Sequence, residues 1–217
     1  MIKKLQKLKA KKGFTLVELI VVIAIIGVLA AILVPTMLGY VENSRITSAD
    51  QIAKTIKDAA QVAATEMDTQ GMGLKTTSLE VVGSYDADAA TGPKVTFAAV
   101  ATGGDPAAAD KPNGVIGDDD VNYKGKNKTG ASAKHATKLG TSLETLLTEQ
   151  TKDLSFIIIY KNGTVAQVYV SEDTTLTSAQ AIKTSMSAAG GKAGKLSTGE
   201  IVGSNPKIED VATMTIN

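Results

Sequence analysis

Glu18 is the first residue in this chain whose type and position suggest chemistry. It is the only formally charged side chain in the run from Phe14 to Val34, FTLVELIVVIAIIGVLAAILV. A charged side chain at the centre of a membrane helix costs about 2.5–3.5 kcal/mol on insertion scales. Glu18 lies near one end of the run, so its cost is smaller, but a leucine there would cost nothing. The carboxylate therefore predicts a partner, and a free amine created by cutting the chain just before Phe14 would be one.

Other residues that could do chemistry are few. The chain has no cysteine and one histidine, His135. This excludes a disulfide scaffold, a thiolate zinc site, a cysteine nucleophile and a multi-histidine metal site. Asp118, Asp120 and Asn122 resemble the start of a calcium loop, but the glutamate at the twelfth position is missing. We interpret them as a solvated acidic turn, and we expect no metal, no cofactor and no catalytic residue.

A basic stretch runs from Lys124 to Lys138. It contains five lysines and His135 and has no acid. Such a stretch could touch nucleic acid or an anionic surface, but no aromatic residues are interleaved with the lysines as stacking platforms. We therefore favour a solubilising loop. We interpret the glycosylation sequons at Asn127 and Asn162 as chance occurrences.

The charge of the chain is unevenly distributed. Of its 23 basic residues, six lysines precede residue 14 without any acid, which leaves 17 basic against 22 acidic residues in the remainder. The following 21 apolar residues would form a helix about 31 Å long, which matches the hydrocarbon thickness of a bilayer. The lysines place the N-terminus in the cytoplasm and everything after about residue 40 outside. The alternative is a secretory signal cut near Ala30-Ala31, but the run is longer than a usual signal core and contains Glu18.

The residues KKGFTLVELIVVIAIIGVLAAILVP resemble the N-terminus of a type IV pilin precursor. The match covers about residues 11 to 40, under a fifth of the chain. It implies that a prepilin peptidase removes residues 1–13 by cutting between Gly13 and Phe14, and methylates the new N-terminus at Phe14. It also implies that Glu18, at the fifth mature position, faces the Phe14 amine of a neighbouring subunit and sets the axial register of a filament.

Gly27 and Pro35 interrupt the apolar helix. Pro35 cannot donate a hydrogen bond to the carbonyl of Ala31, so the helix should kink or loosen there. The resemblance implies that helical order around these positions is lost during assembly. A passive kink in a membrane helix is the alternative, since proline and glycine are tolerated there.

The pattern of apolar residues changes beyond Pro35. Residues 14–40 form the apolar part of the helix, and residues 41–70 form an amphipathic part. Apolar residues recur at spacings of three and four, and they are small and rich in alanine. They are Val41, Ala49, Ile52, Ala53, Ile56, Ala59, Ala60, Ala63 and Met67. Gly71 supplies a stop, so we predict one helix from Phe14 to about Thr69. A coiled coil of a membrane sensor is the alternative, but sustained leucines at heptad positions are missing.

We predict that residues 71–217 form a globular head. We predict that residues 74–138 form a long, partly irregular excursion over the surface, with short strands near 79–82 and 94–97. A capping box at Thr141 and Glu144 predicts the start of a short helix. Residues 154–160 and 164–170 predict two strands joined by a type I′ turn at Asn162-Gly163, the first covered on both faces.

In the rest of the head we predict a helix over about residues 178–189, which ends at Gly190-Gly191. We also predict a closing strand over residues 211–216. The sheet would span about residues 154–216 and contain three to five strands. Without cysteine, the C-terminal region must be held by strand pairing alone. The fold class is therefore α+β, with a long N-terminal helix packed on an antiparallel head.

From these features the chain is identified as a structural pilin subunit and not an enzyme. We expect it to polymerise with copies of itself after a stage in the lipid bilayer, with prepilin peptidase and the pilus-assembly machinery as partners. Adhesion, motility and DNA uptake all stay open. A pseudopilin of a secretion or competence system is the first alternative, and a signal-anchored extracellular binding protein the second. The resemblance and the absence of cysteine favour a Gram-positive source.

Overall fold

The computed structural model describes residues 13–69, 72–74, 78–90, 92–97, 121–123, 131–191 and 193–214. It divides into two compact units, residues 1–44 and residues 45–217, which are described one at a time. Several predicted features lie outside the described residues: positions 1–12 and 71, Asp118, Asp120, Asn127 and the lysines from 124 to 128. For Asn122 and His135 the structure describes the backbone.

The first unit contains the first half of α1 (Leu16–Thr69), which confirms the predicted long helix. The helix runs through Gly27 and Pro35 without a break. Next to the proline, the Thr36 hydroxyl donates to the carbonyl oxygens of Leu33 at 2.9 Å and Ile32 at 3.5 Å. The helix is therefore continuous in the single chain, and its loosening during assembly stays a prediction.

The second unit, residues 45–217, contains the second half of α1 and is called the head from here on. In it, α1 buries one alanine-rich face. The buried residues are Ile46, Ala49, Ile52, Ala53, Ile56, Ala59, Ala60, Ala63, Ala64 and Met67. Their spacing of three and four is the predicted one. Val41 was predicted to join this face, but it lies in the first unit and is exposed.

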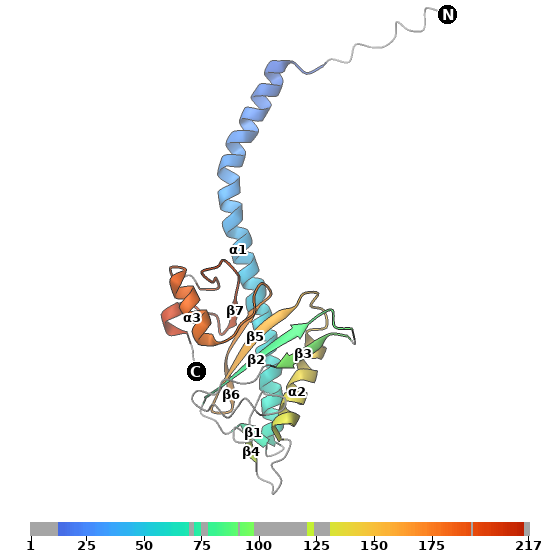
Figure 1. The fold of residues 1–217 in the computed structure, drawn as a ribbon. Coiled ribbons are helices and arrows are strands. Elements are labelled where there is room, and N and C mark those ends of the chain that lie inside the picture. Colours follow the sequence, from blue (N-terminus) through green and yellow to red (C-terminus); the bar gives the residue numbers. More distant parts are fainter. Residues whose placement is uncertain are drawn as a thin grey trace, which may run out of the picture. The chain divides into compact units, whose positions relative to one another are not determined.

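The head contains a five-stranded antiparallel sheet of order β3-β2-β5-β6-β7 (Figure 1). Its strands are β2 (Ser78–Asp86), β3 (Lys94–Phe97), β5 (Leu154–Lys161), β6 (Thr164–Ser171) and β7 (Gly203–Asn205). A second, two-stranded sheet pairs β1 (Met72–Leu74) with β4 (Val121–Tyr123). This confirms an α+β fold with an antiparallel head.

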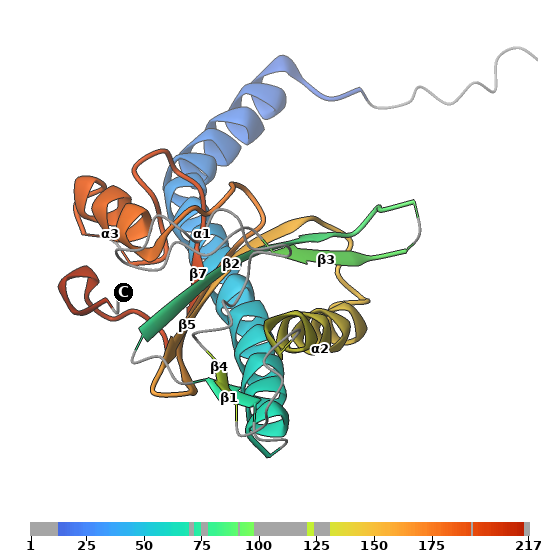
Figure 2. The ribbon, with the colours of Figure 1, turned by 60° about the horizontal axis from the view of Figure 1, so that its bottom comes forward.

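Helices of the head cover both faces of the five-stranded sheet (Figures 1 and 2). The first face carries α1 and α2 (Ala131–Leu146), and the second carries α3 (Ala179–Ala188). Phe156 and Ile158 of β5 belong to the first core, whereas Ile157 and Ile159 belong to the second. The prediction that this strand is covered on both faces is confirmed.

Small residues let α1 approach the sheet closely. A Cβ atom built on Gly203 would lie 2.1 Å from the carbonyl carbon of Ala49, so only glycine fits where β7 passes the helix. The Ser204 N–H donates to Asp50 Oδ1 of α1 at 2.8 Å. A bulge in β6, where Val165 pairs with Tyr160 and Gln167 with Ile159, is also tied to α1. There the Val165 N–H donates to Gln61 Oε1 at 2.8 Å.

The turn prediction at the hairpin is confirmed. Asn162 has φ 51° and Gly163 has φ 78°, which is the left-handed pair that a type I′ turn requires. At the end of α3, Gly190 and Gly191 have φ 83° and 75°, and the Gly191 N–H donates to the Met186 carbonyl oxygen at 3.0 Å. Both glycine-containing signals were therefore placed correctly.

One prediction about the helices of the head was wrong. Thr141 and Glu144 do not open a helix, because α2 begins ten residues earlier, at Ala131. Instead Glu144 Oε1 accepts from the Val95 N–H at 3.0 Å and so satisfies a backbone donor of the edge strand β3. In the stretch predicted as partly irregular, the strands expected near 79–82 and 94–97 are confirmed as β2 and β3; β2 is longer than expected, at nine residues, and α2 begins within the stretch.

The C-terminal region is also built differently from the prediction. Val211–Thr213 form a 3₁₀ helix in place of a strand, because the Asp210 side chain accepts from the Ala212 N–H and caps a helical turn. Strand pairing is not the only restraint on this region. Gln167 Nε2 donates to the Pro206 carbonyl oxygen at 2.6 Å. The Ser171 hydroxyl donates to the Ile201 carbonyl oxygen at 2.7 Å.

Candidate functional site

The largest exposed apolar surface among the described residues is the first half of α1. Every large hydrophobic side chain from Phe14 to Val41 is exposed, from 45% at Val41 to 91% at Phe14. A patch of this size on a single chain marks a surface that a membrane or another protein covers. By length and composition α1 can cross a membrane, since its most apolar 18-residue window has a mean hydropathy of 3.1.

The N-terminus of this helix is closed by a capping box. The Thr15 N–H donates to Glu18 Oε2 at 2.8 Å, and the Thr15 hydroxyl donates to the same oxygen at 2.8 Å. In return the Glu18 N–H donates to Thr15 Oγ1 at 3.2 Å. This reciprocal pair is the geometry of a threonine cap with glutamate three residues later.

The capping box was missed in the sequence, although its signal was present in Thr15-x-x-Glu18. It changes the view of the carboxylate, because Glu18 already has two donors within its own chain. Its negative charge also lies at the positive end of the helix dipole. In the single chain the Glu18 carboxylate therefore acts as a hydrogen-bond acceptor, with Thr15 as its donor.

Both predicted interruptions of the helix, Gly27 and Pro35, are exposed in the part of the chain that the structure describes. A Cβ atom on Gly27 would meet no atom within 4 Å, and neither would one on Gly39. Pro35 lies in the same exposed stretch. Any constraint on these positions must therefore come from helix conformation or from neighbouring molecules.

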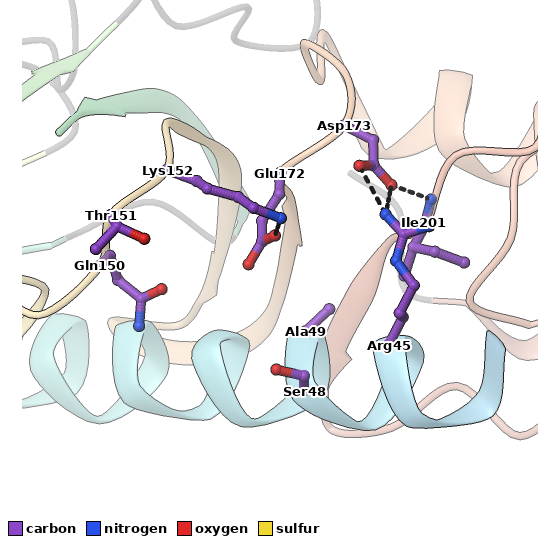
Figure 3. A pocket seen from close by; sticks show the side chains of 9 residues that line it. All are labelled: Arg45, Ser48, Ala49, Gln150, Thr151, Lys152, Glu172, Asp173 and Ile201. Atoms are coloured by element: carbon purple, nitrogen blue, oxygen red, sulfur yellow. Dashed lines mark hydrogen bonds and ion pairs between the residues drawn. The ribbon is translucent and has the colours of Figure 1, made fainter. Parts of the chain in front are cut away.

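A polar cleft of about 300 Å³ opens in the head where α1 passes the strand ends (Figure 3). Two ion pairs occupy it: Arg45 NH2 lies 3.1 Å from Asp173 Oδ1, and Lys152 Nζ lies 2.7 Å from Glu172 Oε2. Asp173 Oδ2 also accepts from the Ile201 N–H at 3.3 Å. These contacts join α1, the segment after β6 and the C-terminal segment. We therefore assign the cleft a structural role.

Two carboxylates of the head are held against backbone donors. Burial raises the pKa of Asp50, against the opposing effects of the Ser204 N–H and of Lys207. Burial likewise raises the pKa of Glu80, whose Oε1 accepts from the Ala179 N–H at 2.9 Å at the start of α3. Burial, together with the charge of Glu80, raises the pKa of the Tyr169 hydroxyl. These contacts hold α3 and β7 in place, so we assign both carboxylates a structural role.

The described residues contain no cluster of three histidine, aspartate or glutamate side chains that could hold a metal ion. Of the weak calcium candidates, Asp118 and Asp120 lie outside the described part of the chain, and Asn122 lies in β4. The basic stretch is described only in part: Lys138 pairs with Glu66 of α1, with 2.9 Å between Nζ and Oε2. At least this lysine has a structural partner within the head.

Comparison with known proteins finds a family model and curated relatives to which this chain is similar. Residues 8–34 match the family model of the prokaryotic N-terminal methylation motif. A fimbrial protein of Pseudomonas aeruginosa is 46% identical over 59 residues, which are 27% of this chain and 38% of that protein. A type IV major alpha-pilin of Moraxella bovis is 38% identical over 88 residues, 40% of this chain and 55% of that protein.

A type IV major fimbrial protein, FimA, of Dichelobacter nodosus is 51% identical over 37 residues, 17% of this chain and 24% of that protein. The chain therefore spans about half or less of the length of the curated relatives it matches. No solved structure matches it. The relatives are named as fimbrial proteins or pilins, and none of these three as an enzyme.

The relatives come from Gram-negative bacteria, so the comparisons give no support to the Gram-positive source favoured above. The motif match at residues 8–34 overlaps the exposed apolar half of α1. The five-stranded antiparallel head is the α+β body predicted for such a helix. The resemblance inferred from the sequence is thus confirmed: the N-terminal segment of this chain is similar to that of proteins with the methylation motif, and the chain is similar to fimbrial proteins and type IV pilins.

Proposed function

We propose that this chain is a structural subunit that polymerises into a type IV pilus. The observation that carries the proposal is the apolar half of α1, exposed along its whole length and coincident with the methylation motif. Such a surface needs lipid around it before assembly and copies of itself afterwards.

Processing is the first step of the proposal. A prepilin peptidase removes residues 1–13 by cutting between Gly13 and Phe14, and Phe14 becomes the methylated N-terminus. The position of the cut is compatible with the helix cap, because Thr15 keeps its backbone N–H when Gly13 is removed. The exposed Phe14 and the start of α1 at Leu16 leave the cleavage site outside the helix.

Glu18 then acts in two stages. In the bilayer, its carboxylate is satisfied by the N–H and hydroxyl of Thr15. In the filament, the amine of Phe14 in a neighbouring subunit pairs with it. A carboxylate and an amine together offset much of the desolvation that either would suffer alone in a dry core. The pair thereby sets the axial register, and Gly27 and Pro35 are the positions at which the helix loosens to fit.

The location follows from the same helix. Before assembly the subunit spans the cytoplasmic membrane once with its N-terminus inside, as its six N-terminal lysines direct. The pilus-assembly machinery then draws it out of the bilayer. The head is carried outside the cell on the surface of the filament.

Mass spectrometry of the N-terminus of the protein from its host tests the processing step. We expect a mature chain that starts at methylated Phe14. A chain that keeps Met1, or one that starts after residue 30, contradicts the proposal, because the first has no free Phe14 amine and the second has lost the apolar helix.

Three substitutions separate the two roles of Glu18. Glu18→Val should insert and be cleaved but give no filaments, since an unpaired buried amine would remain. Glu18→Gln keeps an acceptor for Thr15 but has no charge, and it should fail as well. Thr15→Ala keeps the charge and should still assemble. Filaments are measured in the sheared fraction, and normal filaments from Glu18→Gln would show that the carboxylate only caps the helix.

A further inference from the structure

The five-stranded sheet of the head has two edge strands, β3 and β7. A sheet edge presents backbone N–H and C=O groups that no neighbouring strand pairs, so it can accept a strand from another molecule. In this head, side chains of α1 and α2 accept hydrogen bonds from N–H groups at both edges. The edges are thus closed by helices instead of by further strands.

At β3 the closed group is the Val95 N–H. In the antiparallel register Val95 lies opposite Tyr85 of β2, but its N–H donates to Glu144 Oε1 at 3.0 Å. Val95 and Tyr85 are therefore a non-hydrogen-bonded pair, and the N–H of Val95 points to the outer edge of the sheet. Because α2 lies beside this strand (Figures 1 and 2), Glu144 reaches the edge from the helix.

The edge at β7 is closed in the same way by α1. Ser204 lies opposite Tyr169 of β6, and its N–H donates to Asp50 Oδ1 at 2.8 Å. In this strand of three residues the middle N–H is then the one that points outward, and α1 takes it. Where β6 extends beyond β7, the Val165 N–H donates to Gln61 Oε1 of α1 at 2.8 Å.

The edge at β3 is the one that a second molecule can reach more easily. Lys94 and Thr96 of this strand are exposed, whereas Ser204 is 3% exposed. The alternation of the strand directs the backbone groups of Val95 and Phe97 outward. Two antiparallel copies of β3 would therefore pair about a twofold axis at Thr96, with Val95 of each copy opposite Phe97 of the other.

We propose that Glu144 prevents the heads of two copies of this chain from joining through β3. With the carboxylate on the Val95 N–H, a second β3 strand finds this donor already occupied. Without it, two β3 strands pair and the two sheets become continuous. Association through the sheet would compete with association through α1, and Glu144 leaves α1 as the surface for assembly. The inference goes beyond the proposed function, and its test does not require filaments.

Disulfide cross-linking of the full chain in detergent tests the proposal, because the chain has no cysteine of its own. In the paired strands Thr96 of the two copies would form a non-hydrogen-bonded pair, with Cα atoms about 4.5 Å apart, within the range of a disulfide. Under mild oxidation, Glu144→Ala with Thr96→Cys should give about tenfold more linked dimer than Thr96→Cys alone, the effect of freeing one hydrogen-bonding group.

Two controls test the position and the acceptor. Ser84 is exposed and its hydroxyl bonds that of Thr96 at 2.8 Å, but it lies on β2, one strand in from the edge. Two Ser84 residues would be about 14 Å apart across paired β3 strands, so Ser84→Cys with Glu144→Ala should not link. Glu144→Gln keeps an acceptor, and with Thr96→Cys it should link no more than Thr96→Cys alone.

Tyr85→Phe separates an open edge from a general loss of stability. It removes the hydrogen bond from the Tyr85 hydroxyl to the Leu147 carbonyl oxygen, 2.7 Å long and buried, but it keeps Glu144. With Thr96→Cys it should not raise linking. Equal linking from Tyr85→Phe, or no increase from a Glu144→Ala chain that still unfolds cooperatively, overturns the proposal. If Glu144→Ala does not fold, Glu144→Ser, whose side chain is too short to reach the strand, takes its place.

Discussion

The two halves of α1 differ in what surrounds them, although they belong to one helix. The first half exposes isoleucine, leucine and valine on all sides, whereas the second half buries alanine and isoleucine on a single face. Bulky residues on every side demand a surrounding that the chain itself does not supply. Small residues on one face let a sheet approach closely. Side-chain size and distribution therefore tell which half is a surface for assembly and which is part of a core.

Two glutamates repeat this contrast at a smaller scale. Glu18 and Glu80 each accept from an N–H at the start of a helix, Thr15 of α1 and Ala179 near the cap of α3. Glu80 is buried in the head, but Glu18 is exposed in the single chain. The same interaction thus fixes an internal contact in the head and leaves a carboxylate available to neighbours in the first half of α1.

The largest expected effect comes from one substitution made in both halves. Ile56 is 0% exposed and Ile26 is 58% exposed. Ile56→Ala should lower the free energy of unfolding by about 2–5 kcal/mol, because it leaves a cavity in the core. Ile26→Ala should leave it unchanged. Chemical denaturation of the detergent-solubilised full chain, followed by tyrosine fluorescence, measures both. Equal losses would mean that the first half of α1 is also packed within the chain.

A smaller effect is expected at Glu80. Glu80→Ala should cost about 1–3 kcal/mol, because the buried Ala179 N–H loses its acceptor. Glu80→Gln keeps an acceptor and should recover most of that loss. The same denaturation assay at neutral pH compares the two variants. A Gln variant as unstable as the Ala variant would show that the charge, and not the hydrogen bond, holds α3.

The pH dependence of Glu80 has a definite sign. Because burial raises the pKa of the native carboxyl, the native state binds the proton more tightly than the unfolded state. Relative to Glu80→Gln, the wild-type chain should therefore gain stability as the pH falls from the raised pKa to the ordinary glutamate pKa, and then level off. A relative loss over that interval would contradict the burial of the charge.

The smallest effect is expected at Arg45, the first residue of the head. Its ion pair with Asp173 lies at a half-exposed position. Arg45→Ala should lower the free energy of unfolding by about 0.2–1 kcal/mol, and added salt should reduce the difference. Unfolding curves at low and high salt measure it. A salt-independent loss of several kcal/mol would place Arg45 in the core of the head.

Much of the fold followed from local patterns. The long helix, the hairpin with its Asn162-Gly163 turn and the ending of α3 at Gly190 were all recognisable, because each depends on neighbours in sequence. The errors arose where distant segments compete. Glu144 has the spacing of a capping residue, but the edge strand β3 offered it the Val95 N–H. The end of the chain was assigned as a strand, yet Asp210 caps a helical turn there.

The sequence by itself determined the apolar helix, the position of Glu18 in it and the small residues that allow packing, since periodicity and composition act over short range. Only the tertiary structure decided how the head closes. The fit of Gly203 against Ala49, the bonds from Asp50 and Asp173 to the C-terminal segment, and the contact of Glu144 with Val95 join residues far apart in the chain. Such contacts depend on how the elements pack in three dimensions, which no local pattern specifies.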